Sequence, residues 1–247
     1  MELKGKTAVI TGSSGRLGQD IAKALGAAGC NCICHYNRNR QRAEELAEEI
    51  QGMGVKAAAV KADLAEPCQI DGLFEEAERF GRCQVLINSA AVFSRQSLAD
   101  VSFEEAQRVL NVNLTASILA SKAFAKVISA EFGTGDKVIG KIINIADVGG
   151  VRPWAGYVLY CASKSGLIGA TKSIAKELAP AVCVNSIAVG VVSWPSEFDE
   201  AEKKRQLSFI PAGRIGQMGE ITGAIIFLLE SDYITGQTLI VDGGRCI

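Results

Sequence analysis

Strand-length apolar segments alternate with longer amphipathic segments along the whole of this 247-residue chain. This alternation is typical of a parallel sheet covered by helices on both faces. The expected strands cover residues 7–11, 31–35, 57–60, 84–88, 138–146, 182–187 and 238–241. The expected helices cover residues 16–28, 38–53, 67–80, 102–132, 157–179, 203–207 and 220–230. No repeat, low-complexity tract or linker divides the chain, so we expect a single α/β domain over residues 1–247.

Composition excludes several classes of function. The net charge is −1, so the chain lacks the basic footprint of a nucleic-acid-binding protein. No apolar run reaches the roughly 20 residues that a membrane-spanning helix needs. The segment MELKGK leads directly into an expected strand without a signal sequence. Eight cysteines in a chain without an export signal are expected to remain reduced thiols. We therefore expect a cytoplasmic protein without a membrane partner.

Three of the cysteines raise the question of a metal site. Cys30, Cys32 and Cys34 alternate along an expected strand, next to His35, the only histidine. Alternate residues of a strand point to the same face and form a row. Zinc prefers ligands clustered tetrahedrally around one point. We therefore expect no metal in this protein.

The stretch over residues 142–164 carries the first chemical motif. An apolar run ends at Asp147 and a Gly-Gly turn, and a helix with Tyr160 and Lys164 follows. Residues four apart on a helix lie one turn apart on one face. A cation nearby lowers the pKa of a phenol from about 10 towards the working pH. The pair therefore predicts a proton donor and acceptor, although two unrelated surface residues would give the same spacing.

A glycine-rich segment forms the second motif. Residues 11–18 read TGSSGRLG and follow the apolar run Ala8-Val9-Ile10. Backbone amides in such a turn, at the start of a helix, suit a pyrophosphate. Together the two motifs resemble the short-chain dehydrogenase/reductase family, in which TGxxxGxG binds a dinucleotide and YxxxK transfers a proton. The resemblance implies one doubly wound Rossmann domain with a seven-stranded parallel sheet.

The resemblance also implies a set of cofactor-binding and catalytic residues. In the family, Asn113 completes a catalytic tetrad, Asp63 and Leu64 contact the adenine, and Asn88 to Ala91 form the motif after strand four. The residues implied to bind the cofactor are Gly12, Ser14, Arg16, Leu17, His35, Tyr36, Arg38, Asp63, Leu64, Asn88, Ala90, Tyr160 and Lys164.

The end of the second expected strand points to NADPH. An acidic residue there binds the ribose hydroxyls of NADH and repels a 2′-phosphate. This chain has HYNRN at residues 35–39 and no acid until Glu44. Arg38 can pair with a phosphate through two hydrogen bonds. We therefore predict NADPH/NADP⁺ as the cofactor.

Asp147 departs from the common family pattern. Most relatives have serine at this position, thirteen residues before the tyrosine, and it donates a hydrogen bond to a substrate carbonyl. An ionised carboxylate only accepts hydrogen bonds. Asp147 therefore favours a substrate that presents N–H donors, or that needs a proton delivered to a ring nitrogen. A turn-forming carboxylate is the alternative interpretation.

The set formed by Asp147, Tyr160 and Lys164 is similar to that of the pteridine reductases, a branch of this family. Arg16 and the HYxR segment match their cofactor loops, and Phe93 falls where they stack a phenylalanine on the pterin. Val92 and Val189 depart from the branch pattern, where a hydroxyl residue and a proline are usual. Trp154, Tyr157 and Trp194 are further candidates for the pocket, or for simple packing.

We therefore predict reduction of a C=N bond of a pterin, with catalytic residues Asp147, Tyr160, Lys164 and Asn113. The substrate-binding residues expected are Arg16, Phe93, Asp147, Tyr160 and Trp194, with a substrate loop near 190–210. The alternatives are a carbonyl reductase of a ketone or a 3-oxoacyl thioester, and a non-enzymatic NADPH-binding protein.

The resemblance further implies a homotetramer. The helices over 102–132 and 157–179 would form its main interface. Small residues on both helices permit close packing, namely Ala116, Ser117, Ala120, Ala162 and Ala170. The tail DGGRCI at residues 242–247 looks like that of bacterial members, and in some relatives such tails reach a neighbouring subunit's site.

Overall fold

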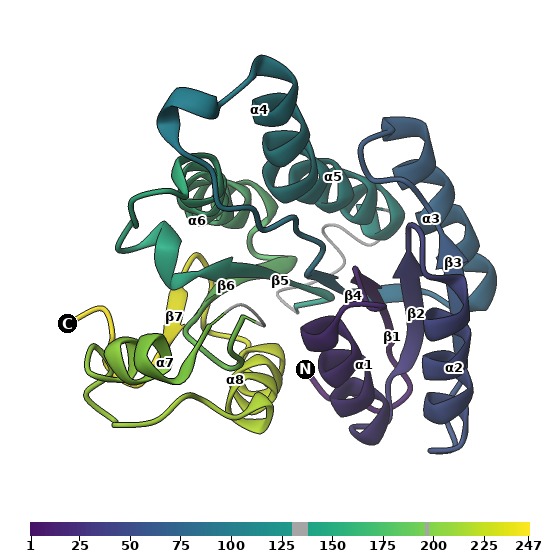
Figure 1. Cartoon of the computed structure of the whole chain (residues 1–247). Helices are drawn as coiled ribbons and strands as arrows, with labels where there is room; N and C mark the ends of the chain where they lie inside the picture. The colour runs from purple at the N-terminus through teal and green to yellow at the C-terminus, as the bar shows by residue number, and fades with distance from the viewer. Residues whose placement is uncertain (130–137, 196–197) are drawn as a thin grey trace.

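The computed structural model of the protein describes residues 1–129, 138–195 and 198–247. Its centre is a seven-stranded sheet in the order β3-β2-β1-β4-β5-β6-β7, and every neighbouring pair is parallel (Figure 1). The strands are β1 (Thr7–Thr11), β2 (Asn31–Tyr36), β3 (Ala57–Lys61), β4 (Cys83–Asn88), β5 (Gly140–Asp147), β6 (Val182–Val189) and β7 (Thr238–Val241). The predicted single-sheet α/β architecture is confirmed.

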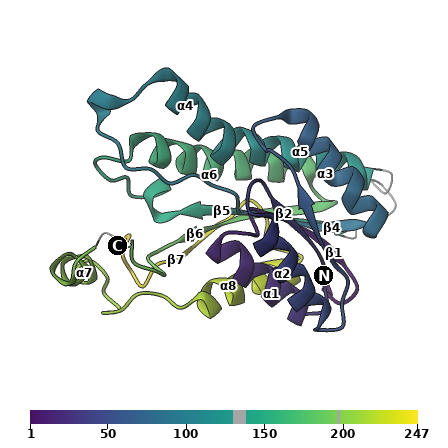
Figure 2. The ribbon, with the colours of Figure 1, turned by 45° about the vertical axis from the view of Figure 1, so that its right-hand side comes forward.

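Helices cover both faces of the sheet. Figure 2 shows α3, α5 and α6 over one face, with α4 beyond them, and α1, α2 and α8 over the other. Their bounds are α1 (Arg16–Ala27), α2 (Arg40–Gln51), α3 (Pro67–Phe80), α4 (Phe103–Leu110), α5 (Ala116–Ile128), α6 (Val158–Leu178), α7 (Glu200–Leu207) and α8 (Met218–Glu230). Short 3₁₀ turns lie at η1 (Leu98–Asp100) and η4 (Val148–Gly150). The helix α7 stands apart from the sheet, beside the C-terminal tail, in both views.

The single helix expected over 102–132 is interrupted. A π-helical turn, η2 (Asn111–Thr115), separates α4 from α5. Within this turn Asn113 is fully buried and its side chain bonds to the backbone of another loop. Helical periodicity does not reveal such a widened turn, because it changes the backbone pairing and leaves the helix intact on either side. Residues 130–132 and the loop expected at 133–137 lie outside the described residues.

The cysteine row in β2 and just before it belongs to the hydrophobic core. Cys30, Cys32 and Cys34 are all buried, and they pack with residues of α1 and α2. Burial raises the pKa of each thiol, to about 11 for Cys30. Among the described residues, no group of three or more His, Cys, Asp or Glu side chains is placed to hold a metal ion. The row is therefore explained by packing.

Within the described ranges, no helix is both long enough and apolar enough to cross a membrane. Of the small residues proposed for a subunit interface, Ala116, Ser117 and Ala120 are buried in the protein's own core. Ala162 on α6 is exposed. The close packing expected of the first three therefore occurs within the chain.

Gly18 in α1 tests the tight junction between this helix and β1. A Cβ at this position would overlap the carbonyl oxygen of Gly12 and lie 2.8 Å from the Cα of Ser13. Because both neighbours are backbone atoms, we expect Gly18→Ala to lower the free energy of unfolding by about 1–3 kcal/mol. Thermal and urea unfolding measure the change. The control is Gly72→Ala in α3, where nothing lies within 4 Å of the added Cβ, and a gain of about 0.5–1 kcal/mol is expected there. Equal stabilities of the two variants would contradict this account.

Candidate functional site

A large cleft opens along the carboxyl ends of the parallel strands. Its volume is about 1630 Å³, and its lining comes from the segments that follow β1 to β6 together with α6, α7 and the C-terminal tail. In open α/β sheets ligands bind outside these strand ends, where the strand order reverses, which here is between β1 and β4. A single small-molecule site usually measures about 300–1,000 Å³. The cleft therefore has room for a dinucleotide and a second molecule.

The turn after β1 is shaped to receive a phosphate. Gly12 has φ of +69°, and a Cβ there would lie 2.7 Å from the Cα of Ala90, so the turn and the end of β4 approach too closely for a side chain. Behind this turn α1 begins at Arg16, and the N-cap residue Gly15 makes no side-chain capping bond. The first amides of the helix are thus free to bind an anion. This end of the cleft fits the pyrophosphate of a dinucleotide.

His35 joins two of the segments that are predicted to bind the cofactor. Its Nδ1 accepts a hydrogen bond from the Gly12 amide at 2.9 Å, so Nε2 carries the proton and donates to the carbonyl of Ala62 at 3.0 Å. Burial lowers the pKa of His35 and keeps the ring neutral. The residue therefore holds the glycine turn and the segment before Asp63 in register.

Most of the expected cofactor-binding residues line the cleft. They are Gly12, Ser14, Arg16, Leu17, His35, Arg38, Asp63, Leu64, Ala90, Tyr160 and Lys164. Tyr36 is buried and is absent from the lining. Asn88 is also buried beneath the cleft, where its Nδ2 donates to Oδ1 of Asn144 at 2.8 Å. The structure thus gives Tyr36 and Asn88 packing environments and leaves a contact with the cofactor as a prediction.

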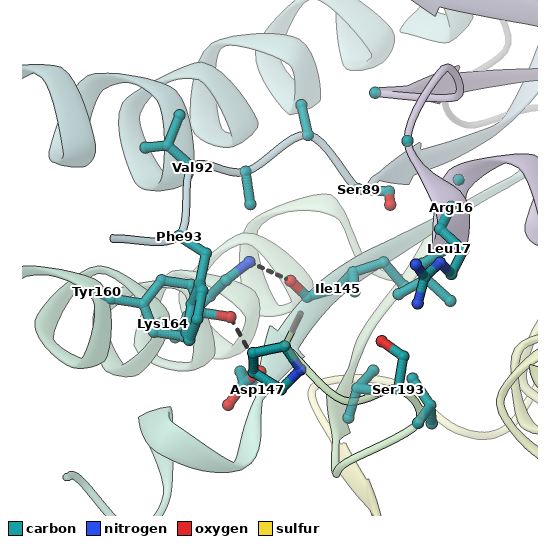
Figure 3. Close-up of a pocket in the computed structure, with 18 of the residues that line it drawn as sticks. Arg16, Leu17, Ser89, Val92, Phe93, Ile145, Asp147, Tyr160, Lys164 and Ser193 are labelled. Carbon is teal, nitrogen blue, oxygen red and sulfur yellow. Dashed lines mark hydrogen bonds between the residues drawn. The ribbon is translucent and has the colours of Figure 1, made fainter. Parts of the chain in front are cut away.

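The side chains of Asp147, Tyr160 and Lys164, which are predicted to be catalytic, meet where β5 ends and α6 begins (Figure 3). The hydroxyl of Tyr160 donates to Oδ2 of Asp147 at 2.9 Å. The other carboxylate oxygen accepts from the amide of Gly149 at 2.7 Å. Lys164 is buried and its Nζ donates to the carbonyl of Ile145 at 2.7 Å. The carboxylate therefore points towards the phenol inside the cleft, as the substrate hypothesis requires.

The electrostatics of this group differ from the expectation. Burial and the charge of Asp147 raise the pKa of Tyr160, whereas Lys164 was expected to lower it. The Lys164 Nζ lies 5.8 Å from the Tyr160 ring centroid and is directed at a carbonyl. The nearer carboxylate of Asp147 therefore affects the phenol more strongly than the ammonium does. Burial also raises the pKa of Asp147 and lowers that of Lys164 to about 8. At neutral pH the Tyr160–Asp147 pair thus retains a proton.

Asn113 acts on the site through the backbone. Its Oδ1 accepts from the Val92 amide at 2.8 Å, and its Nδ2 donates to the Val92 carbonyl at 3.0 Å and to Oγ of Ser163 at 3.1 Å. Ser163 in turn donates to the carbonyl of Tyr160. Asn113 is not among the lining residues. In this structure it positions the loop after β4 against α6, next to the reactive tyrosine.

Aromatic rings form one wall beside the reactive group. Phe93 stacks on Tyr157 with ring centroids 5.0 Å apart, and it meets Tyr160 edge-on at 4.8 Å. Trp154 packs edge-on against Tyr157. Trp194 lines the cleft from the loop after β6. These rings suit a flat substrate, which gains from stacked and edge-on contacts.

Several lining residues had no signal in the sequence. Arg95, Arg205 and Gln206 line the outer part of the cleft together with Arg245 of the tail. None of the first three belongs to a motif, because they reach the cleft only through the placement of the loop after β4 and of α7. Knowledge of that placement, rather than of spacing, was needed to find them.

Comparison with known proteins gives a family match over nearly the full chain. A family model described as enoyl-(acyl carrier protein) reductase, of the short-chain alcohol dehydrogenase type, matches residues 12–245. A 3-oxoacyl-[acyl-carrier-protein] reductase of Synechocystis sp. is 36% identical, over 98% of this chain and 97% of its own length. A 3beta-hydroxysteroid dehydrogenase 1 of Eggerthella lenta is 35% identical, over 100% of this chain and 95% of its own length. Glucose 1-dehydrogenase 2 of Bacillus subtilis is 33% identical, over 100% of this chain and 96% of its own length.

These three names refer to a 3-oxoacyl thioester, a steroid and a sugar, and none of them to a pterin. The broader family assignment agrees with the sheet order, the glycine turn and the Tyr160–Lys164 pair. The chain belongs to the short-chain dehydrogenase/reductase family, whose members are oxidoreductases that use nicotinamide cofactors.

Proposed function

We propose that this protein is an NADPH-dependent reductase of a C=N bond in a pterin, such as a dihydropterin or dihydrofolate. The observation that carries the proposal is the carboxylate of Asp147, hydrogen-bonded to Tyr160 inside the cleft. A ketone oxygen and an ionised carboxylate are both acceptors, so they cannot bind each other. A pterin presents amino and ring N–H donors to the same carboxylate. Asp147 thus favours the nitrogen heterocycle.

The proton inventory of the site agrees with this chemistry. When bound, NADPH supplies a hydride, which goes to the ring carbon of the C=N bond, and the ring nitrogen needs one proton. The Tyr160–Asp147 pair retains a proton at neutral pH, because burial raises the pKa of both groups. The pair delivers this proton while Lys164 holds the ribose, and Phe93 and Arg16 orient the flat ring.

The preference for NADPH rests on two exposed guanidinium groups. Arg16 and Arg38 both line the cofactor end of the cleft, and both side chains are exposed. No acidic residue stands at the end of β2 to repel a 2′-phosphate. A guanidinium binds a phosphate with two parallel hydrogen bonds, which supports NADPH over NADH.

The second candidate is an NADPH-dependent carbonyl reductase, and the comparisons favour it over the first. The relatives are named for reduction of a 3-oxoacyl group and for dehydrogenation of a steroid or a sugar. One physical observation is compatible with it, because burial raises the pKa of Asp147 and a protonated carboxyl is a hydrogen-bond donor. In that form Asp147 would replace the hydroxyl that relatives use for a ketone.

Exposed apolar side chains support a homotetramer as part of the proposal. Phe227 on α8 and Ile240 on the edge strand β7 are both exposed. Val158 at the start of α6 is exposed as well. Surfaces of this kind are commonly covered in oligomers with two-fold symmetry.

Replacement of Asp147 separates the two candidate functions. We expect Asp147→Ser to lower kcat/KM for dihydrobiopterin at least tenfold, because the acceptor for the pterin N–H groups is lost. The same variant should gain activity on ethyl acetoacetate, since serine donates to a ketone. Tyr160→Phe should lower kcat about 10²–10⁴-fold with either substrate while NADPH still binds. Steady-state assays with both substrates measure these effects. Faster reduction of the ketone than of the pterin by the wild-type protein would favour the second candidate.

Arg38 tests the choice of cofactor. We expect Arg38→Gln to weaken NADPH binding about tenfold and to leave NADH binding unchanged, because only NADPH carries the 2′-phosphate. Fluorescence titration of both cofactors gives the two dissociation constants. Arg79→Gln on α3 removes the same charge far from the cleft and serves as the control. A wild-type preference for NADH would reject the prediction.

The pKa of Lys164 predicts how NADPH affinity depends on pH. Burial lowers this pKa to about 8, and only the protonated amine donates fully to the ribose. Below pH 8 the ammonium is already formed and the affinity should be constant. Above pH 8 the binding of NADPH is coupled to the uptake of a proton by Lys164, so the affinity should fall, by up to tenfold per pH unit. Lys164→Met should bind more weakly and show no such slope. Constant wild-type affinity between pH 7 and 9.5 would contradict the role assigned to Lys164.

A further inference from the structure

The outer part of the cleft carries more positive charge than its own residues neutralise. Five residues that line this part of the cleft form what we call the rim: Arg95, Glu202, Arg205, Gln206 and Arg245. They come from the loop after β4, from α7 and from the tail after β7. The rim thus contains three guanidinium groups and one carboxylate. Figures 1 and 2 show α7 beside the C-terminal tail at this end of the molecule.

The contacts of the rim show which cations are already paired. Arg205 donates twice to Glu202, with both nitrogen–oxygen distances 2.7 Å. Gln206 donates to the same carboxylate, and its Oε1 accepts from Nη2 of Arg245 at 2.6 Å. Arg245 therefore has a neutral partner. Among the described residues, neither Arg95 nor Arg245 forms a salt bridge.

The surroundings of Arg245 make a further anion favourable. Its guanidinium is partly buried and lies 5.9 Å from the centre of the Phe209 ring. A second cation, Arg152, donates to the Arg245 backbone carbonyl. Burial is the first cause that lowers the pKa of Arg245, and the charge of Arg152 also lowers it, whereas Cys246, Asp147 and Asp242 act in the opposite direction without forming a salt bridge to the guanidinium among the described residues. Arg95 is exposed and lines the same cleft. The hydrogen bonds from Arg205 and Gln206 lower the pKa of Glu202, and the charge of Arg95 is the smallest contribution in the same direction.

We propose that the substrate of this cleft carries an anionic tail, which Arg95 and Arg245 bind at the rim while the reacting group lies against Tyr160. The proposal rests on the proposed reductase function and adds a substrate class to it. The aromatic side chains of Phe209 and Trp194 line the same cleft, so a flat or apolar linker between head and tail is accommodated there. On a pterin the tail is a carboxylate, and on a thioester it is a phosphorylated arm.

Two pairs of compounds test the tail separately from the head. Each pair shares a reducible head: dihydrofolate and dihydrobiopterin for the pterin, acetoacetyl-coenzyme A and ethyl acetoacetate for the ketone. We expect the wild-type KM to be at least tenfold lower for the charged member of whichever pair is reduced. Increasing ionic strength should raise that KM and leave the uncharged member unaffected. Equal KM values within the reduced pair would overturn the proposal while the reductase function stands.

Variants of the two arginines complete the test. Arg95→Gln and Arg245→Gln should each raise KM for the charged compound about tenfold more than for its uncharged analogue, with kcat little changed. Lysine at either position should restore part of the loss. Arg79→Gln is the control for net charge. Arg95 is exposed, so its variant folds even if a change at Arg245 disturbs the tail. Equal effects on both members of a pair would show a structural role and refute the proposal. If neither head is reduced, inhibitor titration of the NADPH complex with folate and biopterin decides: equal binding overturns it.

Discussion

The close approach of two loops at the reversal of strand order shapes everything else in the cleft. At Gly12 the chain turns through a positive φ against the backbone of Ala90, in a space that admits no side chain. Thr11 secures the junction, because its Oγ1 accepts from the amides of Ser89 and Ala90 at 3.0 and 3.1 Å. This contact directs the free amides of α1 to one side and the loop with Phe93 to the other. The same few atoms therefore shape the two ends of the cleft that are predicted to hold the cofactor and the substrate.

The site beside α6 contains three ionisable side chains, and burial disfavours the charged form of each. Tyr160, Asp147 and Lys164 each have a pKa shifted towards the neutral form, and burial is the first cause in every case. The acidic hydrogen of the phenol is shared with a carboxylate rather than held ready by the ammonium. Such a site retains a proton at neutral pH. Whether the site favours a ketone or a nitrogen heterocycle then depends on whether Asp147 is ionised when the substrate binds.

The sequence was sufficient for those features that local pattern controls. The strand and helix alternation correctly predicted the seven-stranded sheet, and both Tyr160 and Lys164 lie on one helix, α6, as their spacing suggested. It was insufficient where tertiary contacts decide. Burial and the contact with Asp147 raise the pKa of Tyr160, and the side chain of Asn113 in the widened turn bonds to the Val92 backbone. Arg95 has no motif, and its place at the rim depends on how a loop without regular structure is packed.

His35 sets an acid limit on the scaffold itself. Its Nδ1 must keep a lone pair directed at the Gly12 amide, and a proton there would place two N–H groups head to head at 2.9 Å. Burial lowers the pKa of this imidazole, so the arrangement survives well below the range in which an ordinary histidine titrates. Once that reserve is exceeded, the glycine turn after β1 loses its anchor on β2. Strong acid is therefore expected to loosen the end of the cleft that this turn lines.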